Sequence, residues 1–216
     1  MSENKYIEDI NKFNLLFQNF PKYWDGKSCI NEMRSKGRQW RQMEWCGWYF
    51  ELKCKEILKN HFSLPGDKFG NVEFDCRGNI NWDFKNHAIQ SGTNIILNDK
   101  EAIDTSLNNN QYHGFIVSEC DVKYDEDGSF KKWHDQLKGR VSSYQLEAKK
   151  RKANSRKRKV SAELKQIIFM VLNQSDLSKL IIHKQGRNAD GANRKVKYQF
   201  DLRKINEIYH QVLDAK

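Results

Sequence analysis

The sequence Asn-Val-Glu-Phe-Asp-Cys-Arg-Gly-Asn-Ile-Asn-Trp-Asp-Phe-Lys-Asn-His, residues 71–87, is the most informative stretch of this chain. Apolar and polar residues alternate on both sides of the Arg-Gly-Asn sequence at 77–79, and a period of two around a glycine-bearing turn predicts a β-hairpin with one apolar face. The apolar positions are Val72, Phe74, Ile80, Trp82 and Phe84. Asp83 and Lys85 are therefore expected to project from one face, with Asp75 just across the turn.

Two carboxylates and one ammonium group that converge at the edge of a sheet indicate a divalent-metal phosphodiesterase. Mg²⁺ prefers oxygen ligands, keeps several waters and takes only one or two carboxylates from a protein. The metal would polarise a scissile phosphate and acidify a bound water, while the lysine orients that water or offsets charge in the transition state. We therefore predict that Asp75 and Asp83 bind Mg²⁺ and that Lys85 acts on the water.

The order of these residues resembles the active site of the PD-(D/E)XK nuclease superfamily, and specifically its type II restriction endonucleases. The matching positions are Asp75, Asp83 and Lys85, although the first acid follows Phe74 and not a proline. The resemblance implies a restriction-endonuclease-like mixed central sheet flanked by helices. It also implies the main-chain carbonyl of Phe84 as a further metal ligand, and a glutamate from an early helix, for which we select Glu44, with Glu51 two turns along the same face as the alternative.

Three other readings of these residues stay open. Glu119, Asp121 and Lys123 would share a face of a second predicted strand and form a rival site, although that strand runs into the polar turn 125–128. The hairpin itself could carry nothing more than a surface ion pair. His87 lies on the Asp83 face and is a candidate to approach the metal.

Composition limits the classes of protein that fit. The net charge is +10 and five cysteines include no Cys-x-x-Cys pair, which argues against a disulfide framework or a structural zinc site. The longest apolar run, residues 167–172, is too short to span a bilayer, and the N-terminus lacks the apolar stretch of a signal peptide. We expect one domain over residues 1–216, cytoplasmic and without a membrane partner.

Two basic segments predict contacts with nucleic acid. Residues 149–159 contain eight basic side chains, without which the net charge falls from +10 to +2, and such a run is expected to be flexible until phosphates neutralise it. Residues 185–197 form a glycine-bearing loop whose side chains can read base edges or bind phosphates. The candidate DNA-binding residues are Arg156, Lys157, Arg158, Lys159, Arg187, Asn188, Arg194, Lys195 and Lys197.

The remaining pattern predicts an α/β fold. Helical spacing indicates helices over residues 5–19, 38–61, 99–108, 130–139 and 203–213, with Asp99 capping the third. Strands are expected over residues 94–97, 114–124, 180–183 and 198–202, while 167–172 fits a buried strand or helix.

Together these features predict a type II restriction endonuclease that uses Mg²⁺ to cut both strands of double-stranded DNA at a short specific site. Such enzymes usually act on palindromes as homodimers, because a two-fold protein reads a two-fold site. A repair or junction-resolving nuclease of the same fold would have the same sequence signature. A non-catalytic basic DNA-binding protein is the alternative from a different class.

Overall fold

The structure is a computed structural model that describes residues 5–65, 74–139, 146, 157–186 and 192–215. A curled, six-stranded mixed sheet forms its centre, with the strand order β1-β6-β5-β3-β2 and β9 also paired with β6. β3 and β5 are parallel, and every other pair in this sheet is antiparallel. The strands are β1 (Tyr23–Asp25), β2 (Cys76–Arg77), β3 (Asn81–Ala88), β5 (Tyr112–Tyr124), β6 (Lys159–Asn173) and β9 (Tyr209–Asp214).

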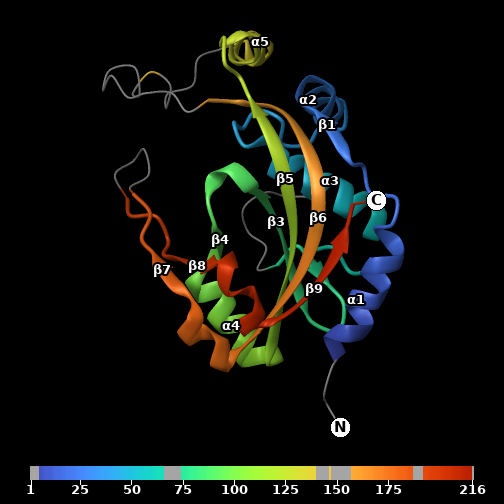
Figure 1. Ribbon diagram of the computed structural model, residues 1–216, viewed down its shortest axis with the longest axis vertical. Helices are drawn as coiled ribbons and strands as arrows, with labels where there is room; N and C mark the ends of the chain where they lie inside the picture. The colour runs from blue at the N-terminus through green and yellow to red at the C-terminus, as the bar shows by residue number, and fades with distance from the viewer. Residues whose placement is uncertain (1–4, 66–73, 140–145, 147–156, 187–191, 216) are drawn as a thin grey trace.

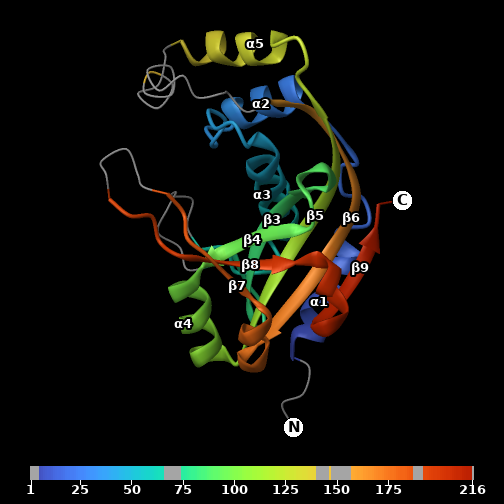
Figure 2. The same ribbon diagram turned by 60° about the vertical axis from the view of Figure 1, so that its left-hand side comes forward.

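Helices cover one face of the central sheet. α1 (Lys5–Leu16), α2 (Gly26–Ser35) and α3 (Trp45–Leu58) contribute to one apolar core, which α5 (Ser129–Lys138) extends through Phe130. Trp82 and Phe84 of β3 point into this core, where the rings of Phe50 and Phe84 are 6.3 Å apart. Figures 1 and 2 show α1 and α3 on this side of the sheet.

The opposite face is covered by a second, three-stranded sheet. It has the order β4-β8-β7, formed by β4 (Asn94–Asp99), β8 (Lys197–Asp201) and β7 (Ile181–His183), and α4 (Lys100–Asn110) packs beside it (Figure 2). Phe115 and Val117 of β5 face this second core, whereas Ile116 between them faces the helices. The central strands are therefore buried on both faces, which is typical of sheets with parallel pairs.

Most predicted elements are present, and the α/β prediction with a mixed sheet flanked by helices is confirmed. The segment 167–172, left open between strand and helix, belongs to β6. The predicted helix over 38–61 is shorter, because α3 begins only at Trp45, and Asp99 precedes α4 without a side-chain cap. None of the helices in the described ranges combines the length and the apolar character that a membrane span requires.

The predicted closing helix at 203–213 is wrong. This segment forms a 3-10 turn, Leu202–Glu207, followed by strand β9. β9 pairs with β6 from Gln166↔Asp214 to Val171↔Tyr209, so it fills an edge whose backbone N–H and C=O groups would otherwise lack partners. Pairing along this edge outweighs the helical spacing of Ile205, Ile208, Tyr209 and Val212.

Candidate active site

The hairpin predicted at 71–87 is short, and its first acid lies directly against the strand that carries the other two site residues. Residues 71–73 are outside the described ranges, and β2 pairs with β3 only at Cys76↔Trp82 and Arg77↔Asn81. Beyond this pair, the Asp75 amide donates to the Trp82 carbonyl at 3.0 Å, and the Phe84 amide donates to Asp75 Oδ2 at 2.9 Å. The Asp75 carboxylate therefore occupies the place of a strand partner at the edge of β3.

A buried aspartate of α1 holds the hairpin turn in place. Asp9 is 4% exposed and accepts hydrogen bonds from the Asn79 amide at 2.9 Å and from Trp82 Nε1 at 2.9 Å. Gly78 lies so close to this carboxylate that a Cβ there would come within 2.4 Å of Asp9 Oδ1. No pattern in the sequence indicates this role for Asp9, yet Asp9 fixes the turn between the two acids of the site.

Asp83 lies between the two sheets and is bound by two side chains. It is only 2% exposed, and its Oδ2 accepts hydrogen bonds from His113 Nε2 and Asn98 Nδ2, both at 2.9 Å. The other ring nitrogen, His113 Nδ1, lies 2.9 Å from Ser106 Oγ, which in turn accepts from Asn81 Nδ2 at 3.3 Å. With Nε2 donating to Asp83, this chain of bonds fixes the orientation of the ring and of the carboxylate.

The pKa values of the two carboxylates are shifted in opposite directions. Burial, together with the negative charge of Asp83, raises the pKa of Asp75 to about 7. Burial also acts on Asp83, but the positive charge of Lys85 and the bonds from His113 and Asn98 hold the pKa of Asp83 below its ordinary value. Such a pair of acids, pushed apart in pKa at one location, is characteristic of functional sites.

Lys85 is the third charged residue of the group. Its charge lowers the pKa of both Asp75 and Asp83. The side chain is partly exposed, and its ammonium has no hydrogen bond or ion pair with any residue in the described part of the chain. Asp75, Asp83 and Lys85 therefore influence one another electrostatically, although Asp83 is buried and does not project into solvent.

The donor set fits a hard dication such as Mg²⁺. The protein hydrogen bonds to Asp75 and Asp83 end on Oδ2 in each case, which leaves both Oδ1 atoms without a protein donor among the described residues. The described ranges contain no group of three His, Cys, Asp or Glu side chains arranged to hold a metal ion. Mg²⁺ is commonly bound by two carboxylates, with water in its remaining coordination positions. A cation would also offset the repulsion between the two acids.

The raised pKa of Asp75 predicts a stability difference that depends on pH. An aspartate whose pKa is about 7 in the folded state stays protonated while the unfolded chain ionises near 4, so the wild type loses stability as pH rises from 4 to 7. In metal-free buffer, Asp75→Asn should gain relative stability over this range, reaching about 1–3 kcal/mol at pH 8. Denaturant unfolding at pH 5 and pH 8 measures it, and an advantage that does not grow with pH would contradict the assignment.

Glu51, and not Glu44, lies in the electrostatic environment of Asp75. The charge of Glu51 contributes to raising the pKa of Asp75, and its carboxylate pairs with Lys55 at 2.6 Å. Glu44 precedes α3, is 57% exposed and pairs with Lys159 at 2.8 Å. Of the two candidate assisting acids, Glu51 is therefore the one with an electrostatic effect on Asp75 in the described residues, and the choice of Glu44 has no such support.

The basic segments are only partly available to a polyanion. Arg156 and residues 149–155 lie outside the described ranges, as do Arg187 and Asn188. Arg158 is 6% exposed and Lys159 is an ion-paired member of β6, so neither is the exposed phosphate contact that the sequence predicted. Lys157 is exposed, although it pairs with Glu126.

The described part of the 185–197 loop keeps its basic side chains at the surface. Arg194 and Lys195 are exposed, and Lys195 is 3.5 Å from Glu101. Lys197 is more enclosed, because it begins β8 and pairs with Asp99 at 3.0 Å. The structure does not bring these residues together with Asp75, Asp83 and Lys85 through any described contact.

In the rival triplet of Glu119, Asp121 and Lys123, the two acids hydrogen-bond to residues outside the candidate site. Glu119 accepts a hydrogen bond from Gln166 Nε2 at 2.6 Å, and the Gln90 side chain donates to Asp121. Both acids thus cross-link neighbouring segments at one end of β5. Asp121 is exposed, as is Lys123.

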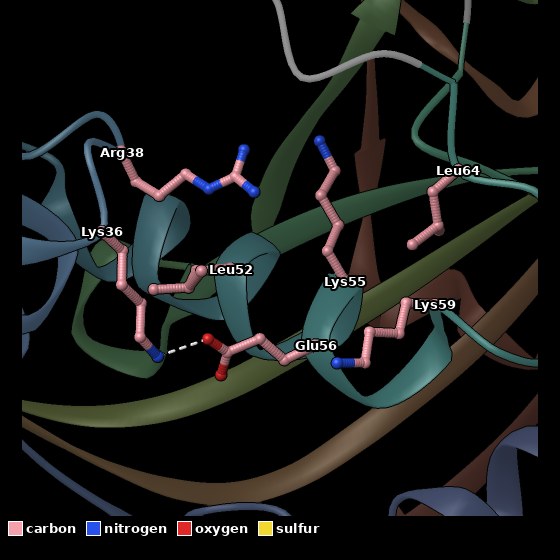
Figure 3. Close-up of a pocket in the computed structure, with 7 residues that line it drawn as sticks. All are labelled: Lys36, Arg38, Leu52, Lys55, Glu56, Lys59 and Leu64. Carbon is pink, nitrogen blue, oxygen red and sulfur yellow. Dashed lines mark hydrogen bonds and ion pairs between the residues drawn. The ribbon is translucent and has the colours of Figure 1, made fainter.

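Two cavities flank α3 and β3. The first, of about 550 Å³, lies beside α3 and is lined by Lys36, Arg38, Lys55 and Lys59 around Glu56 (Figure 3). Lys36 pairs with Glu56 there, and Lys55 pairs with Glu51, so neighbouring carboxylates neutralise part of its positive charge. The second, of about 480 Å³, lies at the end of β3 and includes Glu44, His87 and Lys159.

His113 and Asn98 are the site residues that sequence reasoning missed. His113 stands on β5 opposite Asn81 in the parallel β3–β5 register, and Asn98 comes from the second sheet. A histidine near the start of an apolar strand was the only available signal, and it does not reveal its partner without that register.

Comparison with known proteins adds no relative. No protein-family model, no curated protein and no solved structure significantly matches this chain.

Proposed function

We propose that this protein is a Mg²⁺-dependent endodeoxyribonuclease of the type II restriction kind, which cuts both strands of duplex DNA at a short specific site. The observation that carries the proposal is the hydrogen bond from the Phe84 amide to Asp75, at 2.9 Å, because it fixes the first acid against the Asp83-Phe84-Lys85 strand. The opposite pKa shifts of the two acids support the same assignment. The mixed sheet with helices is compatible with a restriction-endonuclease-like fold.

Each residue has a distinct part in this reaction. Asp75 and Asp83 would hold Mg²⁺, which supplies Lewis-acid polarisation of the phosphate and a more acidic bound water. Asp83 keeps one orientation because His113 and Asn98 bind its Oδ2, so its Oδ1 is presented in a fixed direction. Lys85 would orient the attacking water and offset the charge that develops on the phosphate. Glu51 takes the assisting place first proposed for Glu44.

The net charge of +10 supports a polyanionic substrate, with Lys157, Arg194 and Lys195 as exposed contacts in the described part of the chain. A homodimer is proposed because cutting both strands of a palindromic site requires two active sites related by a two-fold axis.

Incubation of the purified protein with a plasmid of known sequence tests this function. Discrete bands should form with Mg²⁺ and none should form with EDTA, because the acids lack a cation without added metal. A continuous smear with Mg²⁺ would favour a repair-type nuclease without a fixed site. Intact plasmid in both samples, with the plasmid bound, would contradict nuclease activity and favour a basic DNA-binding protein.

A further inference from the structure

The cavity of about 480 Å³ lies where several strand ends meet, close to the candidate active site. Its polar lining comes from segments distant in the sequence: Glu44 before α3, His87 at the end of β3, Asn94 of β4, Tyr124 at the end of β5, and Lys157 and Lys159 around the start of β6. His87 is two residues beyond Lys85 on the same strand face. His87, and with it the cavity, therefore lies about 7 Å beyond Lys85 along β3.

His87 is an unusual residue in this lining. It is only 5% exposed and lines the cavity at the end of β3. A polar ring that borders a cavity is positioned to hydrogen-bond a ligand there. An imidazole ring can both donate and accept a hydrogen bond and offers an aromatic face.

The other side chains fit the parts of a nucleotide. Exposed Lys157, whose ion-pair partner is Glu126, supplies positive charge at one side, and Lys159 is held there by its 2.8 Å pair with Glu44. Tyr124 offers a second ring for stacking, while Asn94 offers both a donor and an acceptor. The volume is within the range of about 300–1,000 Å³ that is usual for small-ligand sites.

We infer that this cavity binds one unstacked nucleotide of a DNA strand, with the base against His87 and Tyr124 and the phosphate at Lys157. The inference rests on the proposed function for the identity of the substrate, and it adds that a nucleotide beside the scissile phosphate leaves the duplex stack. Enzymes that extrude a nucleotide read its base through hydrogen bonds and aromatic contacts in a pocket of this kind.

Binding of a fluorescein-labelled single-stranded hexathymidylate, followed by anisotropy in EDTA, tests the inference. EDTA prevents cleavage and makes the result independent of the metal site. Ser91→Trp would fill the cavity from its exposed rim and should weaken binding about tenfold or more, as expected for loss of one stacked base. The matched control is Ser178→Trp, an exposed serine outside the cavity lining, which should bind like the wild type.

Two further variants separate base contacts from phosphate contacts. His87→Ala should weaken binding about fivefold or more without changing its salt dependence, whereas Lys157→Met should reduce the slope of log K against log salt by about 0.7. Lys59→Met, in the other cavity, is the matched lysine control. The unfolding temperature of every variant verifies that it is folded.

The outcomes distinguish this inference from the proposed nuclease function. No oligonucleotide binding by the wild type, or wild-type affinity in both folded Ser91→Trp and folded His87→Ala, would overturn the nucleotide site even if plasmid is cut. Weakened binding in both variants, combined with intact plasmid, would support the nucleotide site and remove the nuclease function alone.

Discussion

Asp83→Asn is expected to lower Mg²⁺-dependent plasmid cleavage by about a thousandfold or more. A metal ion supplies several kcal/mol of charge stabilisation, and each 1.4 kcal/mol or so is a factor of ten in rate. Asparagine has nearly the same shape, and its carbonyl oxygen can still accept the bonds that His113 and Asn98 donate. The variant should therefore fold, and it should keep its affinity for DNA in EDTA because it loses a negative charge.

The matched control for this change is Asp121→Asn. Asp121 also stands two residues before a lysine on a strand, but it is exposed and bonded to Gln90. Its removal should leave the cleavage rate within about twofold of the wild type, since exposed substitutions away from a site have small effects. Cleavage that is retained in Asp83→Asn and lost in Asp121→Asn would transfer the site to the rival triplet on β5.

Lys85→Met is expected to lower the cleavage rate by about 10²–10³, the usual cost of removing one donor that stabilises charge in a transition state. Methionine keeps much of the apolar stem, and the described residues contain no ion pair that the change would break. Lys123→Met, an exposed lysine on β5, is the matched control and should cleave normally.

The pH profile of Lys85→Met provides a second readout. Lys85 lowers the pKa of Asp75 and of Asp83, so its removal should raise both. Metal binding requires ionised carboxylates, hence the residual activity of the variant should rise with pH at higher values than in the wild type. An unchanged profile together with an unchanged rate would mean that Lys85 does not act at this site.

The local hairpin pattern predicted where Asp75 lies relative to β3, because that information lies within a few residues. Alternation placed Asp83 and Lys85 on one face, and the turn at 77–79 returned Asp75 to the neighbourhood of Phe84. The burial of Asp83 was not predictable in the same way. It depends on Asn98 from the second sheet and on the parallel register that brings His113 to β3, and neither leaves a local signal.

Longer-range pairing also explains the errors in the fold prediction. Residues 209–214 have apolar positions at helical spacing. They form a strand because their backbone pairs with the edge of β6. Ile168 and Phe169 of β6 face opposite cores, so both are buried. The apolar run therefore lacks the alternation of apolar and polar residues that would predict a strand. The sequence predicts that Arg158 and Lys159 belong to a solvated basic run. In the structure β6 begins at Lys159, and both side chains are largely buried.

Direct titration with Mn²⁺, which replaces Mg²⁺ at oxygen sites and can be followed by its paramagnetism, tests the central claim most directly. The wild type should bind the ion, with an affinity that rises about tenfold per pH unit up to pH 7 and then levels off as Asp75 becomes ionised. The double variant Asp75→Asn/Asp83→Asn should lose this binding. Equal Mn²⁺ affinity in the wild type and the folded double variant would contradict a metal centre at Asp75 and Asp83.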